Sequence, residues 1–267
     1  MGSKYFPETS MLEFPLKGME KSYKAHICLC YTPSLTQYLE TVKYLHSKEL
    51  EYFTTLKFER RIISYLAGRY AGKRAVASFL GEENYSQVYI ESGIFNQPIV
   101  IHPNRSNIQL SITHCDYIGA AITFPEALPM GIDIERISSD GDAVLETQMT
   151  IREKELIQSS TYSGTAGLTL LWTAKEALSK ILKTGITTPF KVFEVSRIET
   201  KDNVVISYFK NFPQYCTVSF MFKQYVCSIT YPKIVELDTQ ILRDLSIDIK
   251  NSFWGLSHRK NLDTSKI

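Results

Sequence analysis

The sequence predicts an α+β protein with two similar halves, each a small, mainly antiparallel sheet packed on a long helix. The segments 59–80 and 168–183 have the apolar spacing of amphipathic helices. Short strand-like segments bounded by turn residues accompany each of them. Because a helix followed by antiparallel strands occurs twice, we expect two α/β subdomains in a pseudo-twofold arrangement, although the halves share no sequence identity that would establish a repeat.

In the first half, the apolar run 25–31 predicts a strand, and 35–45 has helical spacing. The segment 59–80 is the longest strongly helical one, with Gly81 as a natural stop. Strand-like segments follow at 87–90, 98–101, 108–112 and 117–124. The Pro-flanked turn 125–129 then separates two predicted subdomains, residues 1–128 and residues 129–267.

The second half has a similar order. Strand 131–135 precedes helical pieces within 142–158, the helix 168–183, and strands near 191–198, 203–209, 215–222 and 225–230. From Pro232 on we expect a mixed tail with a short helix near 237–245. The polar residues 257–267 are expected to fray.

The composition is that of an ordinary soluble globular protein. The 267 residues are 44% hydrophobic and 22% charged, and the net charge of +2 argues against bulk nucleic-acid binding. No segment approaches the roughly 18 apolar residues of a membrane span, and no signal peptide is visible. Five scattered cysteines indicate a reducing compartment: Cys28, Cys30, Cys115, Cys216 and Cys227. We therefore expect a cytoplasmic protein without membrane or nucleic-acid partners.

Two carboxylates share one side of the strand Gly131-Ile132-Asp133-Ile134-Glu135. The isoleucines alternate with Asp133 and Glu135 at period two, so both acids point the same way. Acidic residues are also common on the exposed face of an edge strand. Two interpretations of this pair therefore remain open: surface acids, or oxygen ligands of a metal ion.

The segment Trp172-Thr173-Ala174-Lys175-Glu176-Ala177-Leu178-Ser179-Lys180 predicts a helix. Trp172, Glu176 and Lys180 fall at i, i+4 and i+8 and share a face. Glu176 and Lys180 could form an ordinary surface ion pair, and Trp172 could be core. If the helix packs beside strand 131–135, however, three carboxylates and a lysine converge. Three oxygen ligands with open positions suit Mg²⁺, which substrate phosphates usually complete.

Two further segments could bind phosphate. His114 ends the strand segment Ser111-Ile112-Thr113-His114, where it is either a structural histidine or, beside the hydroxyls, a donor to a phosphate oxygen. Arg61 and Arg69 lie on the basic helix 59–80, in which Gly68 and Gly72 form a narrow strip. This helix has either a solvated basic face or an anion site, which the planar guanidinium of arginine suits.

Taken in order, Ser111-Ile112-Thr113-His114, Gly131-Ile132-Asp133-Ile134-Glu135 and Leu171 to Lys180 resemble the motif set of the 4'-phosphopantetheinyl transferases. They are most similar to the surfactin-type, pseudo-dimeric branch. The helix with Leu66-Ala67-Gly68-Arg69 is similar to the arginine-containing helix of its siderophore-synthesis members. The resemblance spans about residues 58–190, including the turn 183–190. The Gly-Ile-Asp-Ile-Glu and Trp-x-x-Lys-Glu-Ala pair at this spacing is specific.

The resemblance implies the 4'-phosphopantetheinyl transferase fold and a holo-[acyl-carrier-protein] synthase activity. In that reaction the 4'-phosphopantetheine group of coenzyme A is transferred, with Mg²⁺, to a serine of an apo acyl or peptidyl carrier protein, and adenosine 3',5'-bisphosphate is released. Residues 1–128 would contribute to coenzyme A binding, and residues 129–267 would carry the metal site and the catalytic helix. A monomer with internal pseudo-symmetry is expected. The carrier could belong to fatty-acid, polyketide, nonribosomal-peptide or siderophore synthesis.

The resemblance also implies roles for single residues. The metal ligands would be the three acids Asp133, Glu135 and Glu176. Glu176, or a water that it polarises, would accept the serine proton, and Lys180 would neutralise or protonate the leaving group. The predicted coenzyme contacts are Arg61, Arg69, Thr113, His114, Lys175 and Lys180.

Asn96-Gln97 stands where the family has Gly and a basic residue before Pro98, which predicts one altered coenzyme contact. Thr113 replaces a common serine and keeps its hydroxyl. By family analogy, the carrier docks near 138–165.

Two alternatives to this function are another Mg²⁺-dependent phosphotransferase and a non-catalytic module that binds carriers or coenzyme A. The sequence lacks the Gly-rich phosphate loops expected of the first, and retention of the acids and lysines counts against the second.

Overall fold

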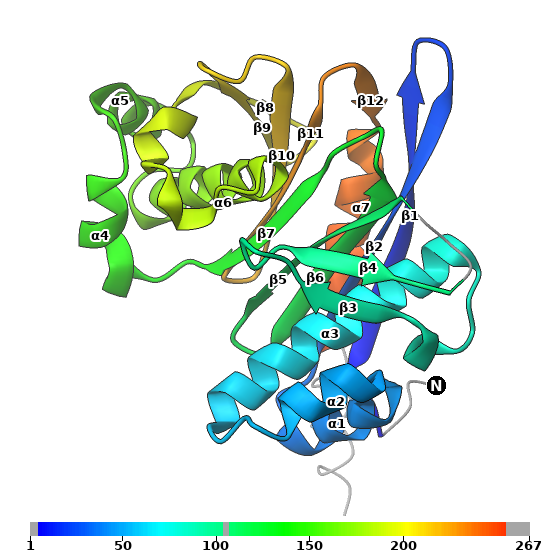
Figure 1. The fold of residues 1–267 in the computed structure, drawn as a ribbon. Helices are drawn as coiled ribbons and strands as arrows, with labels where there is room; N and C mark the ends of the chain where they lie inside the picture. The colour runs from blue at the N-terminus through cyan, green and yellow to red at the C-terminus, as the bar shows by residue number, and fades with distance from the viewer. Residues whose placement is uncertain (1–4, 104–106, 255–267) are drawn as a thin grey trace, which may run out of the picture.

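Two five-stranded antiparallel sheets organise the chain (Figure 1). The structure is a computed structural model that describes residues 5–103 and 107–254, so the expectation for 257–267 lies outside the described residues. The first sheet has the order β12-β1-β2-β6-β5 and the second the order β7-β11-β10-β9-β8. The first contains β1 (Glu8–Gly18), β2 (Ser22–Tyr31), β5 (Ile108–Cys115), β6 (Ile118–Pro125) and β12 (Val235–Leu237). The second contains β7 (Gly131–Arg136), β8 (Val195–Lys201), β9 (Val204–Phe209), β10 (Tyr215–Phe222) and β11 (Tyr225–Pro232).

One long helix packs on each sheet. In the first half, α3 (Glu59–Leu80) contacts β2, β5 and β6, and it ends at Gly81, whose φ of 67° gives the left-handed C-cap that glycine favours. In the second half, α6 (Thr165–Leu182) contacts β7, β10 and β11. Shorter helices precede each long one: α1 (Leu35–Leu39) and α2 (Ser47–Phe53), then α4 (Asp142–Thr147) and α5 (Ile151–Ser159). The small hairpin of β3 (Tyr89–Ser92) and β4 (Pro98–Ile101) follows α3.

The core has three parts because both sheets are buried on two faces. On β2, Ile27 and Leu29 face a core shared by both sheets, whereas Cys28 and Cys30 face α3. A third cluster fills the space around α6. The last helix, α7 (Thr239–Trp254), packs on β1, β9 and β10 and thus closes the shared core. The α+β prediction, with two sheet-bearing halves, is confirmed.

The chain after Pro232 contributes more than the mixed tail expected from the sequence. β12 pairs with β1 of the first sheet, and α7 runs beyond the predicted short helix to Trp254. Its buried residues Leu242, Leu245 and Ile249 lie at i, i+3 and i+7, so the helix places one apolar stripe in the shared core.

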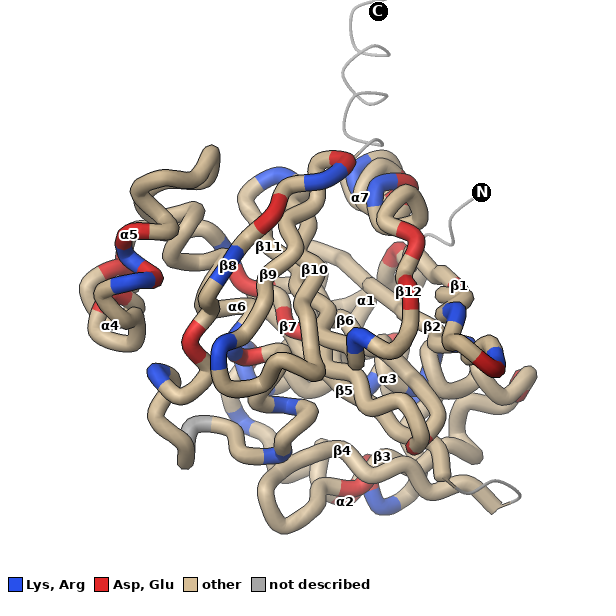
Figure 2. Tube along the Cα trace, turned by 90° about the horizontal axis from the view of Figure 1, so that it is seen from above, with Lys and Arg blue, Asp and Glu red and all other residues tan. Residues whose placement is uncertain are grey.

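Lys and Arg residues are interspersed with Asp and Glu residues along the chain (Figure 2). This distribution agrees with the small net charge of +2. Among residues 5–103 and 107–254, no helix is both long and apolar enough to cross a bilayer.

Two glycines allow the long helices to approach the sheets closely. A Cβ atom on Gly131 of β7 would lie 2.0 Å from the carbonyl oxygen of Ala177 in α6, and one on Gly119 of β6 would lie 2.2 Å from that of Ala67 in α3.

We expect Gly131→Ala to lower the free energy of unfolding by about 1–3 kcal/mol, because strand and helix backbones must separate. Urea unfolding would measure this loss. Gly141→Ala is the control, since nothing lies within 4 Å of its Cβ position. Equal stability of both variants would contradict this account of the packing.

Candidate active site

The two sheets meet edge to edge at β5 and β7. Instead of a backbone ladder, the hydroxyl groups of two β5 side chains join these strands. Ser111 Oγ accepts the backbone N–H of Ile132 at 3.1 Å, and Thr113 Oγ1 accepts that of Ile134 at 3.3 Å. The two hydroxyl residues are two positions apart on β5, and the two N–H groups are two positions apart on β7, so both hydrogen bonds form in one strand register. This junction explains why small hydroxyl residues precede His114.

Asp133 lies at the centre of the junction and is only 5% exposed. Its Oδ1 atom accepts hydrogen bonds from Thr113 Oγ1 at 2.9 Å and from Lys180 Nζ at 2.8 Å. The Lys180 ammonium also donates to the backbone carbonyls of Ile132 at 2.8 Å and Ile112 at 3.2 Å. All three N–H groups of Lys180 are therefore used between the halves. The other oxygen, Asp133 Oδ2, is buried and has no hydrogen-bond partner among the described residues.

Glu135 and Glu176 interact electrostatically with Asp133. Burial raises the pKa of Glu135 to about 7, and the charges of Asp133 and Glu176 add to this effect, while Lys180 and a hydrogen bond from Trp172 oppose it. Burial likewise raises the pKa of Glu176 to about 6, with Asp133 adding to it and Lys180 opposing it. The charge of Asp133 thus disfavours ionisation of both glutamates, and a bound cation would offset this repulsion.

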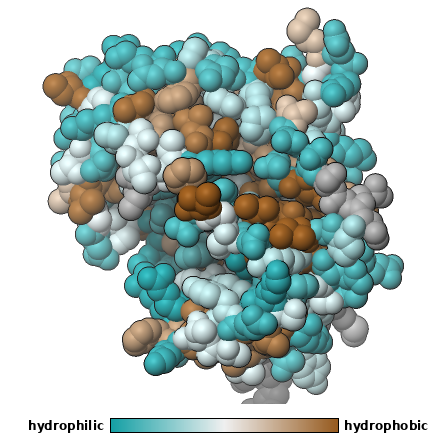
Figure 3. Space-filling model, viewed as in Figure 1, coloured by the Kyte–Doolittle hydropathy of each residue, from teal (hydrophilic) through white to brown (hydrophobic). Residues whose placement is uncertain are grey.

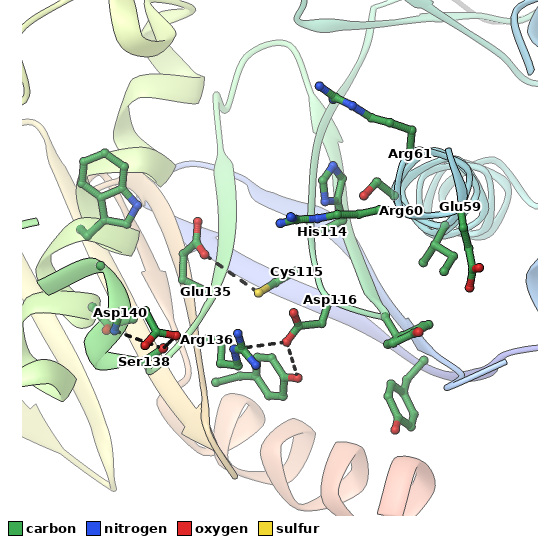
Figure 4. A pocket seen from close by; sticks show the side chains of 18 of the residues that line it. Glu59, Arg60, Arg61, His114, Cys115, Asp116, Glu135, Arg136, Ser138 and Asp140 are labelled. Atoms are coloured by element: carbon green, nitrogen blue, oxygen red, sulfur yellow. Dashed lines mark hydrogen bonds and ion pairs between the residues drawn. The ribbon is translucent and has the colours of Figure 1, made fainter. Parts of the chain in front are cut away.

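A large cleft opens beside these acids, with a volume of about 1380 Å³. Figure 3 shows a recess between the two halves, and Figure 4 shows the side chains that line the cleft. Arg60 and Arg61 of α3 lie with His114 on one side, and Glu135 lies across from them. Cys115 lies between them, its sulfur 4.0 Å from Glu135 Oε2. The cleft thus has two arginines on one side and the Glu135 carboxylate on the other.

A second cavity of about 610 Å³ shares Arg61, Ser64 and His114 with the cleft. Arg69 lines it, and the Nε atom of Arg69 is buried without a hydrogen bond, although Glu49 Oε1 lies 3.5 Å away. Three tyrosine rings and a further cation also line it: Tyr52, Tyr65, Tyr89 and Lys48. Aromatic rings beside arginine and lysine suit an anion that carries a flat ring.

His114 is shared by both cavities. The surrounding protein atoms lower its pKa by desolvation, and the Lys180 charge lowers it further, whereas Asp133 opposes the shift. The imidazole is therefore neutral at pH 7 and can donate one hydrogen bond into the cleft.

The structure brings most of the predicted site residues together. Asp133, Glu135, Glu176, Lys180 and Thr113 meet at the junction of the halves, while Arg61, Arg69 and His114 line the adjoining cavities. Lys175 is different. Its side chain is completely buried, and its Nζ pairs with Glu153 Oε2 at 2.7 Å. One residue along a helix is a rotation of about 100°, so Lys175 points away from the face that carries Glu176. The predicted contact of Lys175 with a coenzyme phosphate is therefore corrected.

Arg60 and three further cleft residues were not singled out from the sequence. Asp116 Oδ2 accepts the hydroxyl of Tyr225 at 2.9 Å and lies 3.5 Å from Arg136 Nε (Figure 4). Arg136 directly follows Glu135, and its position after the acidic strand was a usable signal. Tyr225 had none, because it reaches the cleft through the β7–β11 pairing, in which Tyr225 lies opposite Arg136.

The acidic set fits a hard divalent cation in its chemistry. Within the part of the chain that the structure describes, no three His, Cys, Asp or Glu side chains stand together as a ready-made metal site. Magnesium, however, is usually held by one or two carboxylates and completed by waters and substrate phosphates. The unpartnered Asp133 Oδ2 and the raised pKa values of its neighbours are consistent with that arrangement.

The raised pKa values predict how stability depends on pH when no metal is present. Glu135 and Glu176 bind protons more tightly in the folded than in the unfolded state. Their stabilising contribution is complete below the ordinary value of 4.5 and is lost as pH rises through about 6 and 7. Urea unfolding in EDTA should therefore show a decrease from these groups between about pH 5 and pH 8.

Glu135→Gln should flatten this decrease, because the amide does not titrate. An identical pH dependence in the wild type and in Glu135→Gln would contradict the assignment.

Comparison with known proteins shows which family the chain belongs to. The sequence model of the 4'-phosphopantetheinyl transferase superfamily matches residues 129–230. A holo-[acyl-carrier-protein] synthase of Streptococcus mutans is 38% identical over 90 residues, which make up 32% of this chain and 75% of the relative. The crystal structure of a holo-(acyl-carrier-protein) synthase from Bacillus anthracis in complex with CoA (3',5'-ADP) is 19% identical, covers 42% of this chain and 96% of that chain, and has a TM-score of 0.34. The chain covers most of the length of the Streptococcus relative. It therefore belongs to the 4'-phosphopantetheinyl transferase superfamily.

Proposed function

We propose that the protein transfers the 4'-phosphopantetheine group of coenzyme A to a serine of an apo acyl or peptidyl carrier protein. The observation that carries this proposal is the arrangement of the cleft: Glu135, which interacts with Asp133 and Glu176, lies on one side, and Arg60, Arg61 and the neutral His114 lie across from it. A pyrophosphate between them would meet cations on one side and, through a divalent metal, the carboxylates on the other. Membership of the superfamily supports the same reaction.

The smaller cavity is the proposed site of the nucleotide end of coenzyme A. Arg69 and Arg61 provide guanidinium groups for the 3'-phosphate, and the tyrosines that line the cavity offer faces for the adenine ring. The larger cleft would then hold the pyrophosphate and the pantetheine arm. His114, which both cavities share, would donate to a phosphate oxygen at the boundary.

Asp133, Glu135 and Glu176 are the proposed ligands of Mg²⁺. The ion would act as a Lewis acid, stabilising the charge that develops on the pyrophosphate oxygens. The side chains of this chain perform the remaining work of orienting the coenzyme and moving the proton.

In the transfer step, the serine Oγ attacks the β-phosphorus of coenzyme A, and the bond from that phosphorus to the oxygen of adenosine 3',5'-bisphosphate breaks. The proton of the serine hydroxyl passes to Glu176 or to a water that Glu176 holds. The burial that raises the pKa of Glu176 to about 6 makes it a competent proton acceptor near neutral pH. Arg60 and Arg61, on the opposite wall, would neutralise charge on the departing phosphate.

Lys180 would support Asp133. Its three N–H groups bind Asp133 Oδ1 and two backbone carbonyls, one from each half. This arrangement fixes the orientation of the Asp133 side chain, and it joins the strand that carries Asp133 to the strand that carries His114. Charge stabilisation of the leaving group by Lys180, expected from the resemblance, would act from this position.

We also propose that the chain is a pseudo-dimeric, surfactin-type member that acts as a cytoplasmic monomer. The superfamily match falls within residues 129–230, whereas the first half adds a second sheet, a second long helix and the arginine wall of the cleft. We therefore propose two subdomains, residues 1–128 and residues 129–267, each with its own sheet and long helix. The exception is β12, which comes from the second subdomain but pairs with β1 of the first sheet.

The test is incubation of the full chain with coenzyme A, MgCl₂ and a panel of apo carrier proteins, followed by mass spectrometry of the carrier. We expect a mass increase of one phosphopantetheine group on the carrier serine, which is lost when EDTA replaces magnesium. Coenzyme A binding without transfer to any carrier would indicate a non-catalytic module. Phosphate transfer without the pantetheine arm would indicate another phosphotransferase.

A further inference from the structure

Each half of the protein buries one glutamate–lysine ion pair. In the second half, Glu153 Oε2 lies 2.7 Å from Lys175 Nζ, and both side chains are completely inaccessible to solvent. In the first half, Glu49 Oε2 lies 2.7 Å from Lys73 Nζ, and both side chains are 1% exposed. We call Glu153–Lys175 the second-half lock and Glu49–Lys73 the first-half lock.

The two glutamates have the same local role. Each is the third residue of a short helix, α5 or α2, and completes a capping box with the N-cap residue, Thr150 or His46. The Oε2 atom of each glutamate accepts the N-cap backbone N–H at 2.8 Å. The Oε1 atom accepts an N–H from the start of a strand, that of Val195 at 2.8 Å or that of Ile90 at 3.2 Å. Each carboxylate therefore ties a helix end to a strand.

The two lysines also match. Lys175 of α6 donates to the carbonyl of Gln148, at the junction of α4 and α5, at 3.0 Å. Lys73 of α3 donates to the carbonyl of Tyr85 at 3.3 Å and to that of Val88, just before β3. In both halves, the long helix is thus joined through one ammonium group to the short helix and to the neighbouring loop.

The helices held by the two locks form walls of different cavities. The α4–α5 segment borders the large cleft through Gly141 and Leu145. Helix α2 borders the smaller cavity through Lys48 and Tyr52, and Glu49 itself lies 3.5 Å from Arg69 Nε. A buried ion pair adds little net stability, because both charges must be removed from water. It can, however, hold the segments that carry it in one specific arrangement. The second-half lock lies behind the wall of the cleft, whereas Glu49 of the first-half lock lines the smaller cavity itself, and both placements point to such a role.

We propose that the two locks are positioning devices, each of which sets the wall of one lobe of the site: the second-half lock sets the acceptor side, and the first-half lock sets the nucleotide side. This inference rests on the proposed function for the identity of the two substrates. Lys175, which lies next to Glu176 in the sequence, thereby acts on the site through α4 and α5 without touching a substrate.

The test compares two matched double variants of the full chain, Glu153→Gln/Lys175→Met and Glu49→Gln/Lys73→Met. Glutamine keeps an oxygen for the strand N–H, and removal of both charges leaves no unpaired ion within either lock. The first-half variant also removes Glu49 as the ion-pair partner of Arg69, which is part of its expected effect on the nucleotide side. We expect the second-half variant to raise the KM for apo carrier about tenfold, with the KM for coenzyme A and kcat within about twofold. The first-half variant should raise the KM and the calorimetric Kd for coenzyme A about tenfold and leave the KM for carrier unchanged.

A purely structural role would lower the folded fraction, and with it the apparent kcat, without changing either KM. That result, or the same KM change in both variants, would overturn the proposal. If a double variant does not fold, the milder cap variants Thr150→Ala and His46→Ala should show the same division with changes of about threefold.

If the wild-type chain transfers no phosphopantetheine, the proposed function fails. Amide hydrogen exchange of the two double variants then tests the locks separately. Exchange should then increase in α4 and α5 only for the second-half variant, and in α2 only for the first-half variant. Increases in both halves of either variant would show that the locks are not separate devices.

Discussion

The Asp133→Asn variant is expected to lose at least about 100-fold in phosphopantetheine transfer while remaining folded. A metal ion that acts as a Lewis acid contributes several kcal/mol to transition-state stabilisation, and each 1.36 kcal/mol corresponds to about a factor of ten in rate. Asparagine retains an oxygen that can accept from Thr113 and Lys180, as Asp133 Oδ1 does. It replaces the unpartnered Oδ2 with an amide NH₂ group, which cannot bind a cation.

Initial rates at saturating coenzyme A and carrier would measure the loss. Calorimetric titration with Mg²⁺ in the presence of coenzyme A should show weakened binding in the same variant. Asp248→Asn is a matched control, because Asp248 also accepts hydrogen bonds from hydroxyl groups but lies on α7, outside both cavities. Wild-type rates and wild-type Mg²⁺ dependence in Asp133→Asn would show that this carboxylate is not a metal ligand.

Local sequence patterns identified the elements that carry the chemistry. The acidic strand was predicted from period-two alternation and forms β7, and the glycine that follows the helix 59–80 is the left-handed C-cap at Gly81. Both signals act over a few residues and do not depend on the rest of the chain. The convergence of Glu176 and Lys180 on Asp133 also followed from helical spacing once the helix was assumed to pack beside the strand.

Contacts between distant segments were harder to predict. β1 was not expected, since Pro15 lies within it, yet it pairs along its length with β2. The period-two recurrence of Leu12, Phe14 and Leu16 was a usable signal for this strand. Lys175 was assigned to the coenzyme because it lies in the motif, but its partner Glu153 comes from a segment with no fixed spacing to it. Tyr225 reaches the cleft only through strand pairing across a different part of the second half. Such contacts depend on tertiary packing, which residue spacing does not encode.

The Glu176→Gln variant should lower kcat by about 100-fold or more, since general base catalysis contributes about 10² to 10⁴. Glutamine keeps one oxygen that could bind the metal, so the variant removes mainly the ability to accept the serine proton. Because the base must be ionised, the wild-type kcat should fall at acidic pH; a bound cation favours the carboxylate, so this limb should lie below the value of about 6 that Glu176 has without metal. In Glu176→Gln this acidic limb should disappear.

Rate profiles from about pH 4.5 to pH 8, with coenzyme A, carrier and Mg²⁺ saturating, would test both statements for Glu176→Gln, since protonation of the base is seen on the acidic side. Glu126→Gln, in the turn after β6, serves as a control for loss of one negative charge. Glu176→Ala should lose activity at least as completely, because it removes the metal ligand as well as the base. A Glu176→Gln variant that keeps the wild-type kcat and the same acidic limb would assign proton transfer to another group. Loss of activity through a higher KM for coenzyme A alone would reduce Glu176 to a binding residue.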